Sequence, residues 1–408
     1  MAAMALVLDH GGGNLVVGCA EDDAGPRVLA NVKAKVKGRS ETYLAEQVES
    51  CADVSSLLLR RPFDRGQCVA WDGQREIWDH MFRDVVQVEP GDRPLLITEP
   101  MFTLDALKQE LDETLFEKYG FPSCLVTTAP ALTMQYASKR FEGPIARGGC
   151  GIVVDVGFSA THIVPCFDGR VLNYATKRVD VGGRALTNYM KELISFRSID
   201  VMDETYVIDK VKEDTCFCSL DFVKDLAAAG RRRNQGPFTL EYVLPDGVNF
   251  LRGFVRHREN GVGSAMGEDH QEKITRDQIL HLNNERFVVP ECLFNPTLIG
   301  INQAGIPEAI VQAVQETHPN LHGLLYGNVI VTGGTSKLPN FCARLKQELR
   351  PLVPEHMELS IATPEDPITC AWEGGRMLAR SPAFDRMLVT REEYLEEGHH
   401  RIRRRYPV

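Results

Sequence analysis

Two carboxylates, Asp9 and Asp155, each lie at the end of a short apolar run and are followed by glycines. The runs are Met4–Gly13 (MALVLDHGGG) and Gly151–Gly157 (GIVVDVG), each too short for a helix and typical of a buried strand. Glycines after a strand let backbone amides approach a phosphate closely, so two such turns facing each other would clamp one nucleotide. Acids beside glycine at two equivalent strand ends favour a metal-binding role over the alternative, in which each acid only caps its own turn.

A third strand-to-glycine turn lies at Asn328–Thr335 (NVIVTGGT), where Gly333 and Gly334 follow a β-branched run. A turn without side chains can lie flat against an adenine or a ribose. Each such turn alone is a weak signal, because tight turns after strands are common in α/β proteins. The three together, in the order phosphate, phosphate, adenosine, predict a nucleotide cleft.

The composition is that of a globular protein, with 43% hydrophobic and 25% charged residues. A chain of 408 residues is too long for one typical core, so we expect two lobes with a cleft between them. No apolar stretch approaches the about 20 residues that span a bilayer, and the N-terminus lacks a signal-peptide pattern. An intracellular protein without a membrane segment is therefore expected.

Charge and cysteine content argue against a general nucleic-acid-binding protein and against a protein with a cysteine-ligated metal. The net charge of -10 disfavours wholesale, sequence-independent binding of nucleic acid, because a duplex backbone repels an acidic surface. The eleven cysteines lack a second pair at metal-ligand spacing. We expect them to be reduced and mostly buried.

Periodicity along the chain predicts an α/β protein with mixed sheets and covering helices. Strands are expected at 94–98 and 123–127, and helices at 74–82 and 104–119. The paired glycines before Arg184 predict a further helix start, with the helix running on to Phe196.

The order of the elements also suggests how the chain divides. The first, outer lobe is expected to comprise 1–145 plus 365–408, and the second, inner lobe 146–364. The segment 141–149 is rich in glycine and is the expected hinge. Residues 248–283 are polar with little periodicity, and we expect a mobile surface insertion there.

In this order the motifs resemble the actin superfamily, over nearly the whole chain. The stretches that carry the resemblance are Leu95–Glu99 (LLITE), Asp155–Pro165 (DVGFSATHIVP), Asn284–Phe287 (NERF) with Pro290 and Glu291, and Thr332–Thr335 (TGGT). The resemblance implies an actin-like, duplicated ATPase-domain fold. Two ribonuclease-H-like α/β lobes would flank a nucleotide cleft.

Further stretches look like one nuclear branch of the actin-related proteins. They are Val201–Thr205 (VMDET), Tyr242–Asp246 (YVLPD), Phe294–Pro296 (FNP), Gly305–Ala309 (GIPEA), Ala371–Gly375 (AWEGG) and Val389–Tyr394 (VTREEY). Members of that branch are subunits of SWR/SRCAP chromatin remodellers, so the resemblance implies a scaffold that supports exchange of a Z-type histone variant. The implied partners are a large Swi/Snf-type ATPase, a zinc-HIT subunit, a variant-histone-binding subunit and the nucleosome. The implied location is the nucleus, with the cytoplasm as the alternative.

The resemblance also implies a cofactor, ATP or ADP with Mg²⁺. Asp9 and Asp155 match the two acids that hold the magnesium ion through water, and Leu338 and Ile368 stand where two residues flank the adenine. Lys212 and Glu213 match the pair that contacts base and ribose. The residues implied to contact the cofactor are Asp9, Gly11, Gly12, Gly13, Asp155, Gly157, Ser159, Gly183, Lys212, Glu213, Gly333, Gly334, Thr335 and Lys337.

Several positions depart from the family's pattern. Val16 stands where actins place a phosphate-binding lysine, and Phe158 stands where they carry a second acid. The glutamine that positions the attacking water falls at Pro130, which cannot orient a water. His162 is retained, and we interpret it as a structural core residue. We therefore expect a pseudo-ATPase that holds nucleotide structurally; the alternative is a slow ATP-hydrolysing enzyme.

Two surface segments bear on assembly. The loop region Ser40–Leu59 lacks the glycine-rich tip of the actins, and the insertion at 248–283 would project from the second lobe. Together they predict a chain that forms no filaments. The same two segments are the expected docking sites for partners. The C-terminal stretch Gly398–Tyr406 (GHHRIRRRY) carries four arginines and two histidines. It could contact DNA or an acidic partner, but the favoured interpretation is a solvated, disordered tail.

Overall fold

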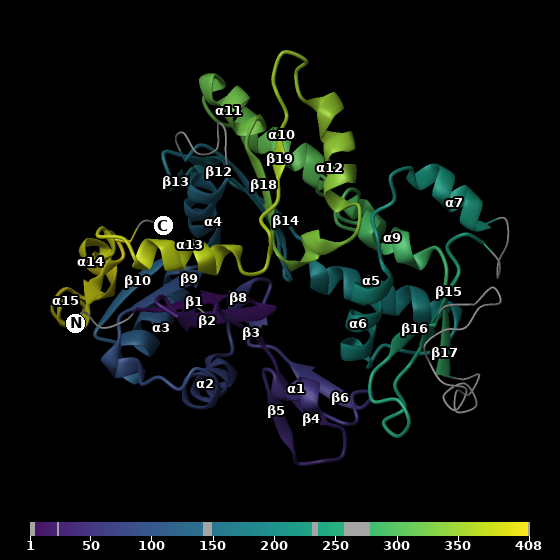
Figure 1. Ribbon diagram of the computed structural model, residues 1–408, viewed down its shortest axis with the longest axis horizontal. Helices are drawn as coiled ribbons and strands as arrows, with labels where there is room; N and C mark the ends of the chain where they lie inside the picture. The colour runs from purple at the N-terminus through teal and green to yellow at the C-terminus, as the bar shows by residue number, and fades with distance from the viewer. Residues whose placement is uncertain (1–4, 23, 142–148, 231–235, 257–277, 407–408) are drawn as a thin grey trace.

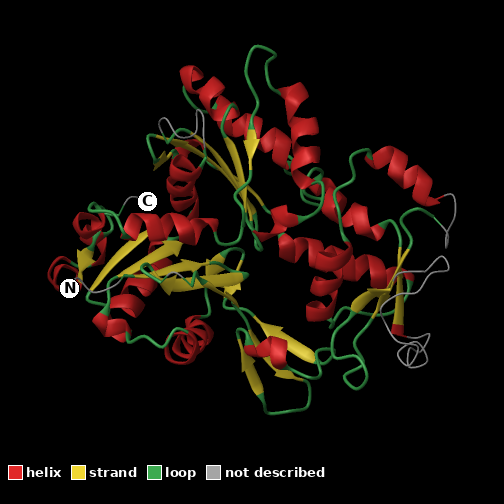
Figure 2. Cartoon of the chain, viewed as in Figure 1, coloured by secondary structure: helices red, strands yellow, loops and turns green. Residues whose placement is uncertain are grey.

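The computed structural model describes residues 5–22, 24–141, 149–230, 236–256 and 278–406 (Figure 1). Two six-stranded and two three-stranded sheets appear as separate groups of strands with helices around them (Figure 2). All eleven cysteines are free thiols, nine of them buried, as the sequence predicted. None of the described helices has the length and apolar character needed to cross a membrane.

The first six-stranded sheet has the order β20-β10-β9-β1-β2-β3. Its strands are β1 (Leu6–His10), β2 (Asn14–Cys19), β3 (Arg27–Ala30), β9 (Leu95–Glu99), β10 (Ser123–Thr128) and β20 (Val389–Thr390). β1 pairs antiparallel with β2 through the glycine turn and parallel with β9. Every residue of β9 is buried, and its first three residues, Leu95–Ile97, are apolar in succession rather than alternating with polar ones.

The second six-stranded sheet repeats this arrangement. Its strands are β11 (Gly151–Val156), β12 (Thr161–Phe167), β13 (Arg170–Val171), β14 (Lys177–Val179), β18 (Val329–Thr332) and β19 (Ile361–Ala362). β11 pairs antiparallel with β12 and parallel with β18, as β1 does with β2 and β9. The duplicated α/β fold expected from the sequence is thereby present.

Helices cover both sheets. Around the first sheet lie α2 (Trp71–His80), α3 (Asp105–Glu113), α13 (Cys370–Ala379), α14 (Phe384–Met387), α15 (Arg391–Glu397) and α16 (His399–Ile402), whereas α4 (Ala129–Arg140) packs between α13 and the core of the second sheet. The remaining helices are α1 (Gln47–Ser50), α5 (Gly183–Arg197), α6 (Thr205–Thr215), α7 (Phe222–Gly230), α9 (Glu285–Glu291), α10 (Ile306–Gln315), α11 (His322–Tyr326) and α12 (Phe341–Leu349). The helices predicted at 74–82 and 104–119 are confirmed, each ending in a wider π-helical turn.

Helices α4 and α13 cross in close contact beside the first sheet. The crossing is close because Gly374 has no side chain: a Cβ there would overlap the backbone carbonyl of Leu132. The adjacent Trp372 is fully buried, and its indole N–H donates to the carbonyl of Val7 at 3.0 Å. Because it fixes α13 to β1, the C-terminal part of the chain becomes part of the first sheet's core.

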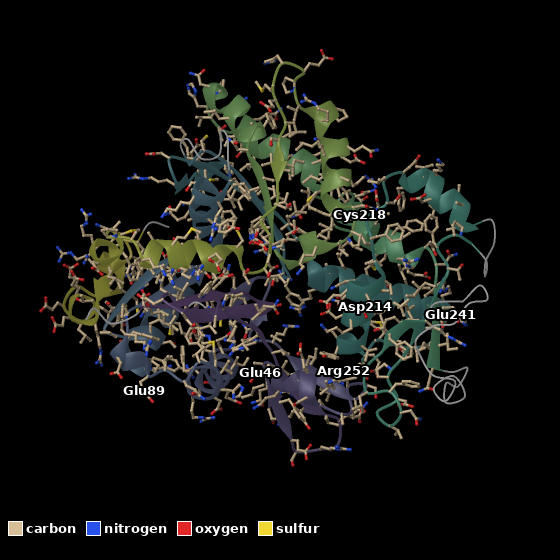
Figure 3. The ribbon with its side chains drawn as sticks, in the orientation of Figure 1. Glu46, Glu89, Asp214, Cys218, Glu241 and Arg252 are labelled. Atoms are coloured by element: carbon tan, nitrogen blue, oxygen red, sulfur yellow. The ribbon has the colours of Figure 1, made fainter. Side chains whose placement is uncertain are left out.

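The two smaller sheets lie near each other and are joined by an arginine. They are β5-β4-β6, formed by β4 (Lys33–Val36), β5 (Thr42–Leu44) and β6 (Leu57–Arg60), and β16-β15-β17, formed by β15 (Leu240–Val243), β16 (Phe254–Arg256) and β17 (Ile279–Leu282). Arg252 reaches from the segment before β16 to the C-terminal end of α1 (Figure 3). It donates to the carbonyl oxygen of Cys51 at 3.0 Å and to that of Glu49.

The expected insertion at 248–283 is ordered at both ends. β16 and β17 pair antiparallel with the two edges of β15, and Leu280 and Leu282 are buried. Their alternation of buried and exposed residues is a strand signal, but it is so short that the polar composition around it hides it. Residues 257–277 of the insertion, and 142–148 of the expected hinge, lie outside the described residues.

The expectation of a solvated, disordered C-terminal tail is wrong. Arg403 donates to both carboxylate oxygens of Asp112, at 2.8 and 2.6 Å, and to Glu99 at 2.5 Å. His399 bonds the same Asp112 at 2.7 Å, and Tyr406 is buried. Asp112 and Glu99 have almost no exposed side-chain area, and buried carboxylates need cationic partners, so these basic residues are drawn onto the first sheet's core.

Candidate functional site

One cavity, of about 720 Å³, contains all fourteen residues that the sequence assigned to a cofactor. They come from the turn after β1, the turn after β11, the start of α5, the end of α6 and the turn after β18. A cavity of this volume is within the range of small-molecule and cofactor sites. The duplicated strand-turn arrangement therefore brings the three glycine turns to one place, whereas their roles toward a ligand remain predictions.

The two strand-end acids are half-buried and line the same cavity. The hydroxyl of Thr98 donates to Asp9 at 2.6 Å; burial raises the pKa of Asp9, and this hydrogen bond partly offsets the rise. Burial, together with the negative charge of Asp9, raises the pKa of Asp155 to about 7. A divalent cation beside the pair would favour both ionised forms and reverse these shifts.

The residues present suit a cation that keeps its own water. Among the described residues, no three histidines, cysteines or acids gather closely enough to hold a metal directly. Mg²⁺ gives up its waters reluctantly and is commonly held by one or two carboxylates. Asp9 and Asp155 are the residues that would hold it, as the sequence predicted.

Replacement of Asp155 by asparagine is expected to stabilise the ligand-free chain in a pH-dependent way. Because the pKa of Asp155 is raised to about 7, the folded chain keeps a proton that the unfolded chain releases above about pH 4. This group's contribution therefore becomes increasingly unfavourable as pH rises from about 4 to about 7. At pH 8 and without Mg²⁺, we expect Asp155→Asn to raise the melting temperature by about 2 °C or more, and by steadily less down to pH 5.

Thermal melts in EDTA across this pH range test the expectation. Asp385→Asn, at an exposed carboxylate of α14, serves as the control and should show no such trend. A difference between Asp155→Asn and the parent chain that stays the same from pH 5 to pH 8 would contradict the assignment.

Two of the glycines are required by the backbone. Gly333 has φ +88°, and a Cβ there would collide with the carbonyl of Val156 and the carboxylate of Asp155. A Cβ on Gly11 would come within 2.7 Å of the carbonyl of Asn14, across the first turn. Both turns thus bring bare backbone to the cavity.

The adenosine side of the cavity is well formed. The hydroxyl of Thr335 donates to the carbonyl of Gly157 at 2.9 Å, which ties the β18 turn to the β11 turn. Leu338 and Ile368, which the sequence placed beside the adenine, both line the cavity and give it apolar walls. A flat aromatic base would fit between such walls and the glycine turn.

Lys212 and Glu213 line the same side, but their charged groups already have partners. The Lys212 ammonium donates to Asp209 at 2.6 Å, to Thr187 at 2.9 Å and to the carbonyl of Gly183 at 3.3 Å. An ammonium has only three N–H donors, so Lys212 is held as part of the wall. Glu213 pairs with Lys210 at 2.9 Å near the cavity mouth.

The cavity wall is apolar at two positions where the resemblance implied polar side chains. Val16 and Pro130 are buried and line the cavity, so neither a lysine amine nor a glutamine amide is present at those points. Burial lowers the pKa of His162 to about 4, and its Nε2 has no hydrogen-bond partner among the described residues. His162 is therefore a neutral imidazole that lines the cavity, which corrects its interpretation as a satisfied core residue.

Arg61 was missed in the sequence. Its side chain lines the cavity and donates to the carbonyls of Gly13 at 3.0 Å and Asn31 at 3.2 Å. Its guanidinium lies 4.3 Å from the centre of the Phe158 ring, and burial lowers its pKa. The only sequence signal was a basic pair at the end of an apolar run, and the path of the chain out of β6 places one member beside the first glycine turn.

The residues fit a nucleotide in part. The adenosine side and the acid pair suit a nucleoside and a hydrated cation. Between them, however, the two glycine turns touch: a Cβ on Gly13 would lie 2.7 Å from the Cβ of Phe158, and one on Gly12 would lie 2.9 Å from the hydroxyl of Ser159. The side chains of Phe158 and Ser159 thus lie against the first glycine turn.

A family model described as actin matches residues 2–407, and the chain belongs to the actin family. The match covers both six-stranded sheets and every segment of the cavity. The chain is similar to actin-related protein 6 of Oryza sativa subsp. indica, with 42% identity and 98% of each chain covered. It is 40% identical to actin-related protein 6 of Arabidopsis thaliana, covering 98% of this chain and 99% of that one. It is also 37% identical to actin-related protein 6 of Drosophila melanogaster, covering 99% and 100%.

Proposed function

We propose that this chain is a non-catalytic scaffold subunit of a SWR/SRCAP-type chromatin remodeller and supports exchange of a Z-type histone variant into nucleosomes. The motifs shared with the nuclear actin-related branch support the proposal, as does the similarity to actin-related protein 6 over nearly the whole chain. Its partners would be the Swi/Snf-type ATPase, the zinc-HIT and variant-histone-binding subunits and the nucleosome, and its location the nucleus.

The apolar side chains of Val16, Pro130 and Phe158 in the cavity wall are the observation that carries the non-catalytic part of the proposal. Phosphoryl transfer to water needs a group that orients the water and charges that neutralise the phosphates. Pro130 cannot orient a water, and Val16 and Phe158 bring no charge to the site. Members of the actin family bind ATP or ADP with Mg²⁺, which supplies charge neutralisation at the phosphates. Such a ligand would here be structural, with Asp9 and Asp155 as holders of the cation.

A slow ATP-hydrolysing enzyme is the second candidate. It is favoured by the retained acid pair and by His162, whose neutral, unpartnered Nε2 could accept a proton from water. The two candidates differ in whether the isolated chain turns over ATP.

Omission of this chain from a reconstituted remodeller is expected to lower the rate of histone-variant exchange at least about tenfold, because a missing scaffold removes its partners' positions as well. Adding the chain back should restore the rate. In parallel, the isolated chain should release phosphate from Mg-ATP no faster than its Asp9→Asn/Asp155→Asn variant. Chromatography of the supernatant after desalting and denaturation gives the nucleotide content.

Unchanged exchange without the chain would contradict the scaffold proposal. Steady phosphate release that disappears in the double variant would establish the enzyme instead. Stoichiometric unhydrolysed ATP or ADP would support the structural-ligand role.

A further inference from the structure

We propose that Phe158, held in place by Arg61, determines which ligands the cavity accepts: adenine nucleosides bind on the adenosine side, and the phosphates of Mg-ATP add no affinity while Phe158 stays where it is. This inference rests on the nucleotide cavity of the proposed function. It goes further by naming the ligand class and the residue that selects it.

Phe158 stands between the first glycine turn and the start of α5. On one side, a Cβ on Gly13 would lie 2.7 Å from its Cβ and 3.0 Å from its Cγ. On the other side, a Cβ on Gly183 would lie 3.6 Å from its Cδ2. These positions are in or below van der Waals contact, so no phosphoryl group fits between the ring and either glycine.

Arg61 holds the ring against displacement. Its guanidinium lies over the ring face at 4.3 Å, inside the about 6 Å at which a cation–π attraction acts. Its hydrogen bonds to the carbonyls of Gly13 and Asn31 fix the guanidinium to the first lobe's turn. Both side chains are half-buried, and a cation–π attraction is stronger where water is partly excluded. A ligand that moves Phe158 must therefore break this contact.

Phe158 lines one cavity together with the residues assigned to adenosine and with the acid pair. The adenosine side holds Gly183, Lys212 and Thr335, whose Oγ1 would lie 3.0 Å from a Cβ on Gly183. The acidic side holds Asp9 and Asp155. A nucleoside needs only the adenosine side, whereas the phosphates of a magnesium-bound triphosphate need the amides of the first glycine turn, against which Phe158 packs.

The test is a calorimetric titration of the full chain with adenosine, Mg-ADP and Mg-ATP. The parent chain is expected to bind Mg-ATP within about threefold of adenosine, because the phosphates gain no contacts while the ring packs against the first glycine turn. Phe158→Ala is expected to bind Mg-ATP at least about tenfold more tightly than the parent does, because removing the ring frees the amides of that turn. Phe158→Leu keeps much of the bulk and should change Mg-ATP affinity by less than about threefold.

Phe167→Ala is the matched control. It removes an exposed phenylalanine from the end of β12, in the same sheet but outside the cavity, and should bind like the parent chain. Thermal melts of all four proteins show whether each is folded. If Phe158→Ala proves unstable, the comparison of adenosine with Mg-ATP on the parent chain decides alone.

Three results would overturn the inference. The parent chain could bind Mg-ATP more than about tenfold more tightly than adenosine, or a folded Phe158→Ala could bind Mg-ATP no more tightly than the parent chain does. The third such result is that neither protein binds any of the ligands. A parent chain that binds adenosine and Mg-ATP about equally, beside a Phe158→Ala that binds Mg-ATP more tightly, would support the inference. Hydrolysis by the parent chain would contradict the proposed function, whereas tight binding without hydrolysis contradicts only this inference.

Discussion

Arg403→Ala is expected to cost the protein about 3–5 kcal/mol of stability, the range seen when one partner of a buried ion pair is removed. Arg403 holds Asp112 through two hydrogen bonds and Glu99 through a third. Both carboxylates have 1% or less of their side-chain area exposed. Without the guanidinium, His399 would be left to compensate Asp112, and Glu99 would keep only the ammonium of Lys108, at 4.0 Å.

Thermal melts of the full chain measure the effect, with Arg404→Ala as the control at an exposed neighbour. The control should melt within about 1 °C of the parent chain, because exposed surface substitutions rarely matter. Combining Arg403→Met with Asp112→Asn and Glu99→Gln should recover most of the loss, because the uncompensated charges are then removed. If Arg403→Ala had the same melting temperature as Arg404→Ala, the docked C-terminal segment would not contribute to the stability of the fold.

Gly374→Ala is expected to have the second large effect, a loss of about 3 kcal/mol or more, at the upper end of the cost of overpacking. The added methyl group would overlap the carbonyl of Leu132, a backbone atom that cannot rotate away. Helix α13 would have to move off α4, and Trp372 would lose its hydrogen bond to the carbonyl of Val7. The melting temperature and near-ultraviolet circular dichroism of the tryptophan should both change.

Gly73→Ala provides the matched control for this substitution. Gly73 also lies inside a helix, α2, but nothing lies within 4 Å of the position its Cβ would take. Alanine there should be neutral or stabilise the chain by up to about 1 kcal/mol, through helix propensity alone. Equal effects of the two substitutions would rule out the close helix crossing as the cause.

Much of the site could be predicted because its signals are local. An apolar run that ends in an acid and glycines, as at Asp9 and Asp155, specifies a strand and a bare backbone turn within about ten residues. The repetition of that pattern predicted two turns that face one nucleotide, and the glycine pair at Gly333 added the third turn. The duplicated fold was implied by the family resemblance. The structure brings all of these turns to one cavity.

The parts that could not be predicted depend on partners far away in the sequence. Arg61 bonds a carbonyl 48 residues away, and Arg403 bonds a carboxylate 291 residues away. The sequence shows Arg61 at the end of an apolar run and Arg403 in a polar stretch, and solvent exposure is the ordinary expectation for either arginine. The orientation of Phe158 likewise follows from the arrangement of two turns, although its replacement of an acid was visible in the sequence.

The two partners in the contact made by Arg252 differ in how far their side chains can vary. The Arg252 guanidinium bonds the main-chain carbonyls of Glu49 and Cys51, so it recognises the path of the backbone there and not the identity of the side chains. Residues at the end of α1 can therefore diverge among related proteins without loss of the contact. The other partner tolerates no such divergence, because among side chains only an arginine offers this planar fork of donors. Sequence change at the end of α1 is thus compatible with a strict requirement for arginine at position 252.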